Sequence, residues 1–256
     1  MIYRSIMIFL IKHQELHSCS LKANILTIAR GNKMFNVIRS IPAPQCLSRG
    51  VYNHKAVVDA LVTIFYGKCY LCEQSDLMDP EIEHFIPHRD DNELKYSWNN
   101  LFWACSRCNS IKSDTHENLL DCTKTDFDVF NEIIHLAGNA VTNGVQVYPR
   151  RKRASRKVLN TVELLDKCFN SSSTGLRGIT KVNLMEKLYE ELYYFTGWRM
   201  KLVSARSTEE EIQEAKNKLR AMCNVSYQFS VFWRWHILTD VRLMKKFPNI
   251  RAELQF

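Results

Sequence analysis

The chain has 256 residues, of which 46% are hydrophobic, so it is long enough and apolar enough to bury a substantial core. This composition excludes an intrinsically disordered chain, and no apolar run reaches the roughly eighteen residues that a membrane-spanning helix needs. The 35 lysines and arginines outnumber the 27 acidic residues and give a formal net charge of +8, which favours contact with a polyanion.

The first 33 residues differ in character from the rest of the chain. They open with one arginine followed by a short apolar stretch, which resembles a weak signal segment without a convincing small-residue cleavage site. A second methionine, Met34, begins the part that has the pattern of ordered protein. We therefore expect residues 1–33 to be an upstream extension or a poorly packed helix, which leaves open whether they belong to the native protein.

The next segment is predicted to be a helix. Asn53 can cap it, its apolar residues fall on one side, and it should run to about Tyr66, where Gly67 ends it.

Two short strands and a helix are expected next. Residues 81–86, E-I-E-H-F-I, alternate and end at Pro87, as a strand does. Residues 98–103 are again mostly apolar and could form a second strand that pairs with the first. The apolar residues of 105–117 have helical spacing. The predicted order is strand, loop, strand, helix.

Beyond residue 118 helical periodicity dominates. Helices are expected at residues 126–137, 158–169, 179–204, 208–222 and 226–246. A short strand is expected at residues 145–148, and Thr208 with Glu211 forms a capping-box pattern. The prediction is an α+β protein in which residues 34–118 hold the small two-stranded unit and residues 119–256 form a helical region.

Two Cys-x-x-Cys pairs bracket the predicted strands. Four thiolates, those of Cys69, Cys72, Cys105 and Cys108, suit tetrahedral zinc with no open position, so this metal should be structural. The 32 residues between the two pairs exceed the roughly 15 to 20 of a simple zinc ribbon. The strand unit must therefore lie between the two Cys-x-x-Cys pairs, which we call the first and second knuckle. The alternative is two coincidental pairs of unligated thiols.

The remaining five cysteines are scattered and are interpreted as small buried hydrophobic residues. They are Cys19, Cys46, Cys122, Cys168 and Cys223. Paired metal-binding thiols favour a reducing compartment, and we expect a cytoplasmic location.

A second group of residues lies between and beside the knuckles. It contains Glu83, His84, Asn100 and Asn109, with Lys112 three residues later. Phosphodiester hydrolysis needs a base for water and a divalent cation on the phosphate, and a neutral imidazole and hard oxygen ligands supply these. Because neighbouring strand residues face opposite sides, Glu83 and His84 can share a site only if the strand bends or ends there.

Each of these residues has a simpler interpretation when it is taken alone. His84 could be a structural histidine, and Asn109 could cap the following helix. Their joint occurrence between two knuckles favours the catalytic interpretation.

The motifs E-H-F-I-P, N-N-L and C-x-x-C-N-x-x-K resemble those of the HNH endonuclease family, whose ββα-metal fold holds one catalytic divalent ion. The resemblance implies that His84 is the general base, that Glu83 and Asn109 bind Mg²⁺ or Mn²⁺, and that Asn100 pins the loop between the strands. Asn99 competes with Asn100, which we prefer because it directly precedes the leucine. Many members carry aspartate at the position of Glu83 and histidine at that of Asn109.

Basic residues suggest where nucleic acid would lie. Lys112, Arg107 and Lys95 are expected to contact phosphates, since they lie on or near the helix and loop of the predicted unit. The densest basic run comprises Arg150, Arg151, Lys152, Arg153, Arg156 and Lys157. It is either a second contact with the DNA backbone or a solvated helix start.

An aromatic run near the end of the chain, residues 230–238, is expected to be core. Trp233 and Trp235 fall on different helical faces, so one of them could be partly exposed for a partner.

The wider arrangement is similar to the HNH subunit of Septu-type anti-phage systems. That resemblance implies a nuclease that works with an ATPase partner and cuts DNA, with no membrane association. Two alternatives remain open at this point: a non-catalytic zinc module that binds nucleic acid or protein, and a restriction-type HNH nuclease.

Overall fold

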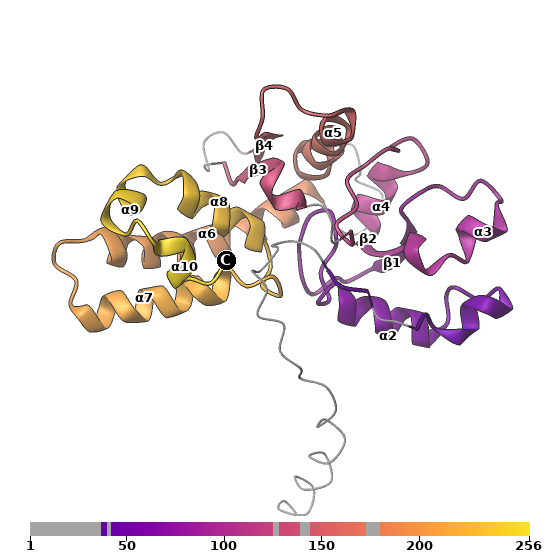
Figure 1. Ribbon diagram of the computed structural model, residues 1–256, viewed down its shortest axis with the longest axis horizontal. Coiled ribbons are helices and arrows are strands. Elements are labelled where there is room, and N and C mark those ends of the chain that lie inside the picture. Colours follow the sequence, from indigo (N-terminus) through magenta and orange to yellow (C-terminus); the bar gives the residue numbers. More distant parts are fainter. Residues whose placement is uncertain (1–36, 40–41, 125–127, 139–143, 173–179) are drawn as a thin grey trace, which may run out of the picture. The chain divides into compact units, whose positions relative to one another are not determined.

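The computed structural model describes residues 37–39, 42–124, 128–138, 144–172 and 180–256 (Figure 1). Residues 33–256 form one compact unit. The expected extension at residues 1–33 lies outside the described residues. Within the described part of the chain, every helix is too short or too polar to cross a membrane.

Helix α2 (Lys55–Ile64) follows a short 3-10 helix, η1 (Gln45–Arg49). The ring of His54 accepts the amide hydrogen of Ala56 and caps α2, one residue after the expected cap at Asn53. The apolar face is buried as its spacing predicted, and Gly67 lies just beyond the end with a φ of 68°.

A ββα unit follows in the predicted order (Figure 1). Strand β1 (Pro80–His84) pairs antiparallel with β2 (Leu101–Cys105), and α4 (Ser106–Lys112) begins where β2 ends. The loop between the strands contains α3 (Asn92–Lys95) and η2 (Trp98–Asn100). The predicted helix at residues 105–117 is shorter than expected because Ser113 has a φ of 44° and leaves the helical conformation.

Residues 126–137, predicted as a helix, do not form one in their described part. The chain forms a 3-10 turn, η3 (Val129–Asn131), and then strand β3 (Ile133–Leu136), which pairs antiparallel with β4 (Gln146–Pro149). Burial alternates along β3, with Ile133 and His135 facing the core. The predicted strand at residues 145–148 is confirmed, and its partner is the segment that was expected to be helical.

The remaining elements are helical, and the α+β class is confirmed. They are α5 (Arg156–Asn170), α6 (Lys181–Val203), α7 (Glu209–Met222), α8 (Ser230–Thr239), α9 (Val241–Lys246) and α10 (Ile250–Glu253). The capping box of Thr208 and Glu211 is present at the start of α7. The helix expected at 226–246 is two helices, because Asp240 leaves the helical conformation and caps α9.

Strand β2 contributes to two clusters of buried side chains. Leu101, Phe102 and Trp103 pack with α2, whereas Ala104 and Cys105 belong to the core that includes α5, α6 and α8. This second core contains residues from both sides of position 118. The expected regions 34–118 and 119–256 therefore share one cluster of buried side chains. Trp233 and Trp235 are both buried, which rules out the exposed tryptophan that the helical wheel suggested.

A buried polar network ties the first knuckle to α8. The carboxylate of Glu73 pairs with Lys68 at 3.0 Å and accepts the amide hydrogen of Val231 at 3.0 Å. Both charged side chains are almost fully buried. Glu73 therefore acts as the cap of α8 although it lies about 160 positions earlier in the chain.

Candidate functional site

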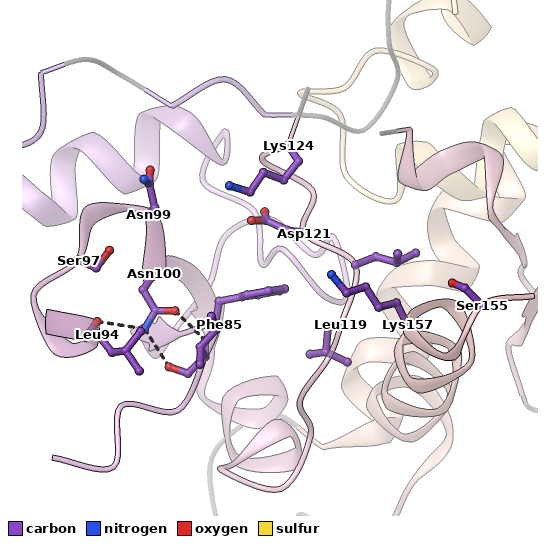
Figure 2. A pocket seen from close by; sticks show the side chains of 12 residues that line it. Phe85, Leu94, Ser97, Asn99, Asn100, Leu119, Asp121, Lys124, Ser155 and Lys157 are labelled. Atoms are coloured by element: carbon purple, nitrogen blue, oxygen red, sulfur yellow. Dashed lines mark hydrogen bonds between the residues drawn. The ribbon is translucent and has the colours of Figure 1, made fainter. Parts of the chain in front are cut away.

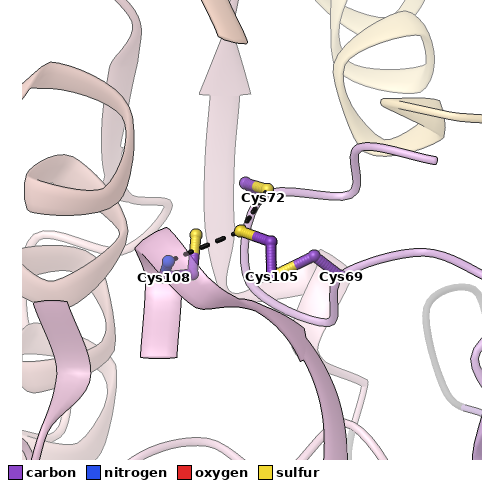
Figure 3. A group of neighbouring side chains, drawn as sticks. All are labelled: Cys69, Cys72, Cys105 and Cys108. Atoms are coloured by element: carbon purple, nitrogen blue, oxygen red, sulfur yellow. Dashed lines mark hydrogen bonds between the residues drawn. The ribbon is translucent and has the colours of Figure 1, made fainter. Parts of the chain in front are cut away.

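The four knuckle cysteines converge on one point. Their sulfur atoms all lie within 4.8 Å of one another, and all four side chains are buried (Figure 3). The first pair lies on a tight loop that is held to β2 by a hydrogen bond from the Tyr70 amide to the Trp103 carbonyl. The second pair spans the junction of β2 and α4, with Cys105 capping the helix through Cys108.

The spacing of the sulfur atoms fits a tetrahedral zinc ion. With Zn–S bonds of about 2.3 Å, the edge of an ideal tetrahedron is about 3.8 Å. The Sγ atoms of Cys72 and Cys105 are 3.9 Å apart. This distance is far too long for a disulfide, so the cluster could hold zinc with every position filled by thiolate. The other described cysteines are buried free thiols, as expected: Cys46, Cys122, Cys168 and Cys223. Of these, Cys168 lies against Cys108 at the edge of the cluster.

A separate cavity of about 290 Å³ lies where β1 ends beside α4. Glu83, His84 and Asn109 all line it, together with His88. The regular strand stops at His84, so the neighbouring side chains of Glu83 and His84 reach the same cavity. The structure thus brings together three of the four residues predicted for catalysis.

The hydrogen bond of His84 fixes which ring nitrogen can act as a base. Its Nε2 lies 3.0 Å from the carbonyl oxygen of Lys95. Because a carbonyl oxygen only accepts, Nε2 must carry the hydrogen, and Nδ1 then has the lone pair. Burial lowers the pKa of His84, and the nearby His88 adds to the effect, so the neutral imidazole is favoured at neutral pH.

The carboxylate of Glu83 is held from two sides. One oxygen pairs with Lys112 at 2.5 Å, and the other accepts the hydroxyl hydrogen of Tyr70 at 2.9 Å. Burial raises the pKa of Glu83, and these two partners oppose that shift by stabilising the anion. Lys112 also donates to the carbonyl oxygen of His84 at 3.0 Å, so one ammonium group fixes both residues.

Asn100 holds the loop between the strands through three hydrogen bonds. Its Oδ1 accepts from the Ile86 amide at 2.7 Å, and its Nδ2 donates to the carbonyls of Ile86 and Leu94 at 2.8 and 3.0 Å (Figure 2). Asn100 also borders a second cavity of about 500 Å³, which Lys124 and Lys157 line on the opposite side. Asn99 is exposed and makes no comparable contact among the described bonds, which supports the choice of Asn100.

Asn109 contacts an acidic residue that the sequence analysis did not select. Its Nδ2 donates to the carboxylate of Glu81 at 2.5 Å. Glu81 lies two positions before Glu83 on β1, so both point toward α4. This alternation in E-I-E-H was the signal that could have identified Glu81.

The donor atoms around the cavity fit a divalent cation such as Mg²⁺. Glu83 offers carboxylate oxygens, Asn109 offers an amide oxygen, and both line a space large enough for waters that complete the coordination. Each oxygen of Glu83 keeps a second lone pair beside its present partner.

The predicted phosphate-contacting cations divide into two groups. The side chains of Lys112 and Arg107 are buried, and Arg107 donates to the carbonyls of Cys168 and Ser171 at the end of α5. These two residues are therefore removed from the set of DNA contacts. Lys95 is half-buried, whereas the run of Arg150, Arg151, Lys152 and Arg153 is exposed.

Comparisons with known proteins agree with this geometry. Residues 69–115 match the family described as HNH endonuclease. A stretch of 53 residues is 42% identical to the Septu protein PtuB of Bacillus thuringiensis and covers 21% of this chain. The match spans about a fifth, 20%, of that relative's length. No solved structure matches the chain significantly.

Proposed function

We propose that the protein is an endonuclease that hydrolyses phosphodiester bonds in DNA with Mg²⁺ or Mn²⁺, because residues 69–115 match the HNH endonuclease family. The observation that carries this proposal is the hydrogen bond from His84 Nε2 to the Lys95 carbonyl. It leaves Nδ1 as the basic nitrogen of a residue that lines the same cavity as Glu83 and Asn109.

The residues of the cavity divide the chemistry among them. His84 Nδ1 removes a proton from a water molecule, whose oxygen attacks the phosphorus while the bond to the leaving sugar oxygen breaks. Glu83 and Asn109 would hold a divalent ion, and that ion would stabilise the negative charge that develops on the phosphate and the leaving oxygen. Lys112 is a positioning residue, since its ammonium group binds Glu83 and the backbone of His84.

The four cysteines would hold zinc that has no part in the reaction. Four thiolate ligands fill a tetrahedral zinc ion, so no position is left for water or substrate. The zinc would instead join the first knuckle to the start of α4, the helix that carries Asn109.

The exposed basic run is proposed as a DNA-backbone contact. Arg150, Arg151, Lys152 and Arg153 lie between β4 and α5 and are exposed. Replacing three of these charges should reduce the slope of log K against log salt by about 2 to 3, since each neutralised phosphate contributes about 0.9 to the slope. An unchanged slope in a salt titration would remove the run from the interface.

The similarity to a Septu protein supports a role in anti-phage defence. We propose that the protein is the nuclease component of such a system and that it acts with an ATPase partner in the cytoplasm. The match that supports this proposal is local, so the partnership needs its own test, which is co-purification of the protein with the product of a neighbouring ATPase gene.

A plasmid-nicking assay with Mg²⁺ or Mn²⁺ tests the catalytic proposal. His84→Ala should lower the cleavage rate by about 100- to 10,000-fold, the usual contribution of a general base. His116→Ala is the matched control, because His116 lines a different cavity beside α5 and should leave the rate within a few fold.

Zinc content and melting temperature should match the wild type in both variants. Cleavage by His84→Ala at the full rate would refute the proposed base. If neither wild type nor variant cuts DNA, even with the ATPase present, the non-catalytic zinc module becomes the better description.

A further inference from the structure

We propose that Glu81 is a positioning residue for the catalytic ion, because it holds the side-chain amide of Asn109 in the one orientation that turns Oδ1 toward the cavity. This inference rests on the proposed function, in which Asn109 is an ion ligand. Neither the HNH motif residues nor the base and ligands named above include Glu81.

The packing of β1 against α4 produces two matched contacts. Glu81 and Glu83 are two positions apart on the strand and share a face, while Asn109 and Lys112 are three positions apart on the helix and also share a face. Glu81 meets Asn109 at 2.5 Å, and Glu83 meets Lys112 at 2.5 Å. The register of strand and helix therefore places one carboxylate against each of these two side chains of α4.

The chemistry of the first contact determines the orientation of the amide. An ionised carboxylate can only accept hydrogen bonds, so the atom of Asn109 that faces Glu81 must be the nitrogen. The oxygen, which is the only atom of this amide that can bind Mg²⁺, is then the one available to the cavity that Asn109 lines. Without an acceptor at position 81, the amide can turn and present its NH₂ group to the ion.

Glu81 acts on the ion through Asn109. The side chains that line the cavity include Glu83 and Asn109, and Glu81 is not among those the structure describes there. Losing such an outer partner of a metal ligand typically weakens metal affinity by about 10- to 100-fold. The role requires a hydrogen-bond acceptor at position 81, and a negative charge is not essential.

Calorimetric titration of Mn²⁺ into the zinc-loaded full-length protein tests the proposal without reference to activity. Glu81→Ala should weaken Mn²⁺ binding by about 10- to 100-fold. Glu81→Gln keeps an acceptor for the Asn109 amide and should bind within a few fold of wild type. Equal losses in both variants would overturn the proposal, because Glu81 would then act through its charge. Unchanged Mn²⁺ binding in Glu81→Ala would overturn it as well.

A second background keeps the test decisive if Glu81→Ala is poorly folded. The two oxygens of a carboxylate are equivalent, so Asn109→Asp needs no orienting acceptor. Adding Glu81→Gln to Asn109→Asp should maintain or improve Mn²⁺ binding, since it removes repulsion between two carboxylates. A loss of 10-fold or more in this background would also overturn the proposal.

Failure of the proposed function has a different signature. If the wild-type protein binds no Mn²⁺ in the cavity, and Asn109→Ala changes nothing, the ion site itself is wrong and the role of Glu81 falls with it. If the wild type binds Mn²⁺ and Asn109→Ala abolishes binding, the site stands, and only the response to Glu81→Ala and Glu81→Gln decides the inference.

Discussion

Asn100 uses every polar atom of its side-chain amide on the backbone of one loop. The oxygen accepts from Ile86, and the nitrogen donates to Ile86 and Leu94, so both ends of the loop between β1 and β2 are fixed by one buried residue. The carbonyl of Lys95, which orients His84, directly follows Leu94. The position of His84, the proposed base, therefore depends on a side chain that does not line the cavity of Glu83, His84 and Asn109.

Asn100→Ala should lower both activity and stability. Three buried hydrogen bonds are lost, and each unsatisfied group costs about 1 to 3 kcal/mol. We expect the free energy of unfolding to fall by roughly 2 to 4 kcal/mol and the nicking rate to fall by at least 10-fold, as measured by urea denaturation and plasmid cleavage.

The exposed neighbour Asn99 provides the matched control for this prediction. Asn99→Ala should change stability by less than about 0.5 kcal/mol. Equal effects of the two substitutions would contradict the assignment of the pinning role to Asn100.

Lys112 and Arg107 illustrate what a sequence cannot reveal about a single charged residue. Both lie on α4, Arg107 within the second knuckle and Lys112 after it, where a surface cation is the ordinary expectation. Lys112 is buried because Glu83 lies opposite it, and Arg107 because the end of α5 presents free carbonyls to it. Both partners depend on how elements pack, and neither packing contact is encoded in the local sequence.

At the scale of elements, the helices with capping signals were predictable and the β3–β4 hairpin was not. The capping box of Thr208 and Glu211 is a local interaction, so it holds wherever the helix packs. The segment that contains β3 carries an apolar pattern compatible with either a helix or a strand. Its pairing with β4 and its contact with α8, where Phe130 stacks on Trp235 at 4.8 Å, decide the outcome.

The start of α8 depends on a residue from the first knuckle. Phe229 precedes the helix with a φ of 55° and offers no side-chain cap, so the free amide of Val231 is satisfied by Glu73. The same carboxylate neutralises the buried ammonium group of Lys68. One buried side chain thus serves both a helix terminus and an ion pair.

Glu73→Ala should destabilise the protein strongly. Breaking a buried ion pair from one side leaves an uncompensated charge and typically costs about 3 to 5 kcal/mol. The expected decrease is measured by guanidinium unfolding of the zinc-loaded protein at pH 7.

The exposed pair of Lys55 and Asp59 on α2 supplies the control, since its side chains are 81% and 60% exposed. Asp59→Ala should cost less than about 1 kcal/mol. A cost for Glu73→Ala as small as that of the surface pair would mean that the buried network contributes little to stability.

At the scale of the whole molecule, the cysteine cluster lies where the two halves of the packing meet. The cysteines belong to the core shared with α5, α6 and α8, while the preceding residues of β2 pack against α2. The spacing of the knuckles predicted the cluster correctly, because two Cys-x-x-Cys loops carry their own geometry. The sequence did not reveal that this cluster would be continuous with the helical region.

Removing the two kinds of metal should have different effects. Depleting Mg²⁺ should stop cleavage and leave the melting temperature nearly unchanged, because Glu83 keeps Lys112 as its partner. Removing zinc should unfold the core cooperatively, since binding of structural zinc contributes about 10 to 16 kcal/mol in small zinc domains. Tryptophan fluorescence and circular dichroism, with zinc release measured in parallel, check both outcomes.

Cys105→Ser should reproduce the loss of zinc without a chelator. A zinc-free protein that keeps the wild-type melting temperature would contradict the structural role of the cluster.

The cap that Glu73 provides to α8 also constrains the order of events during synthesis. The knuckle and the cavity residues leave the ribosome well before Val231. Val231 follows Glu73 by 158 positions, which takes about 8 to 32 seconds at about 5 to 20 residues per second. Until α8 emerges, the pair of Glu73 and Lys68 lacks the Val231 amide and the Tyr227 carbonyl. The guanidinium group of Arg107 likewise lacks the Ser171 carbonyl until α5 has been made. A nascent chain therefore carries all the residues of the proposed cutting site before it has the framework that holds them. We expect the proposed site to be assembled only after the helical region has been made.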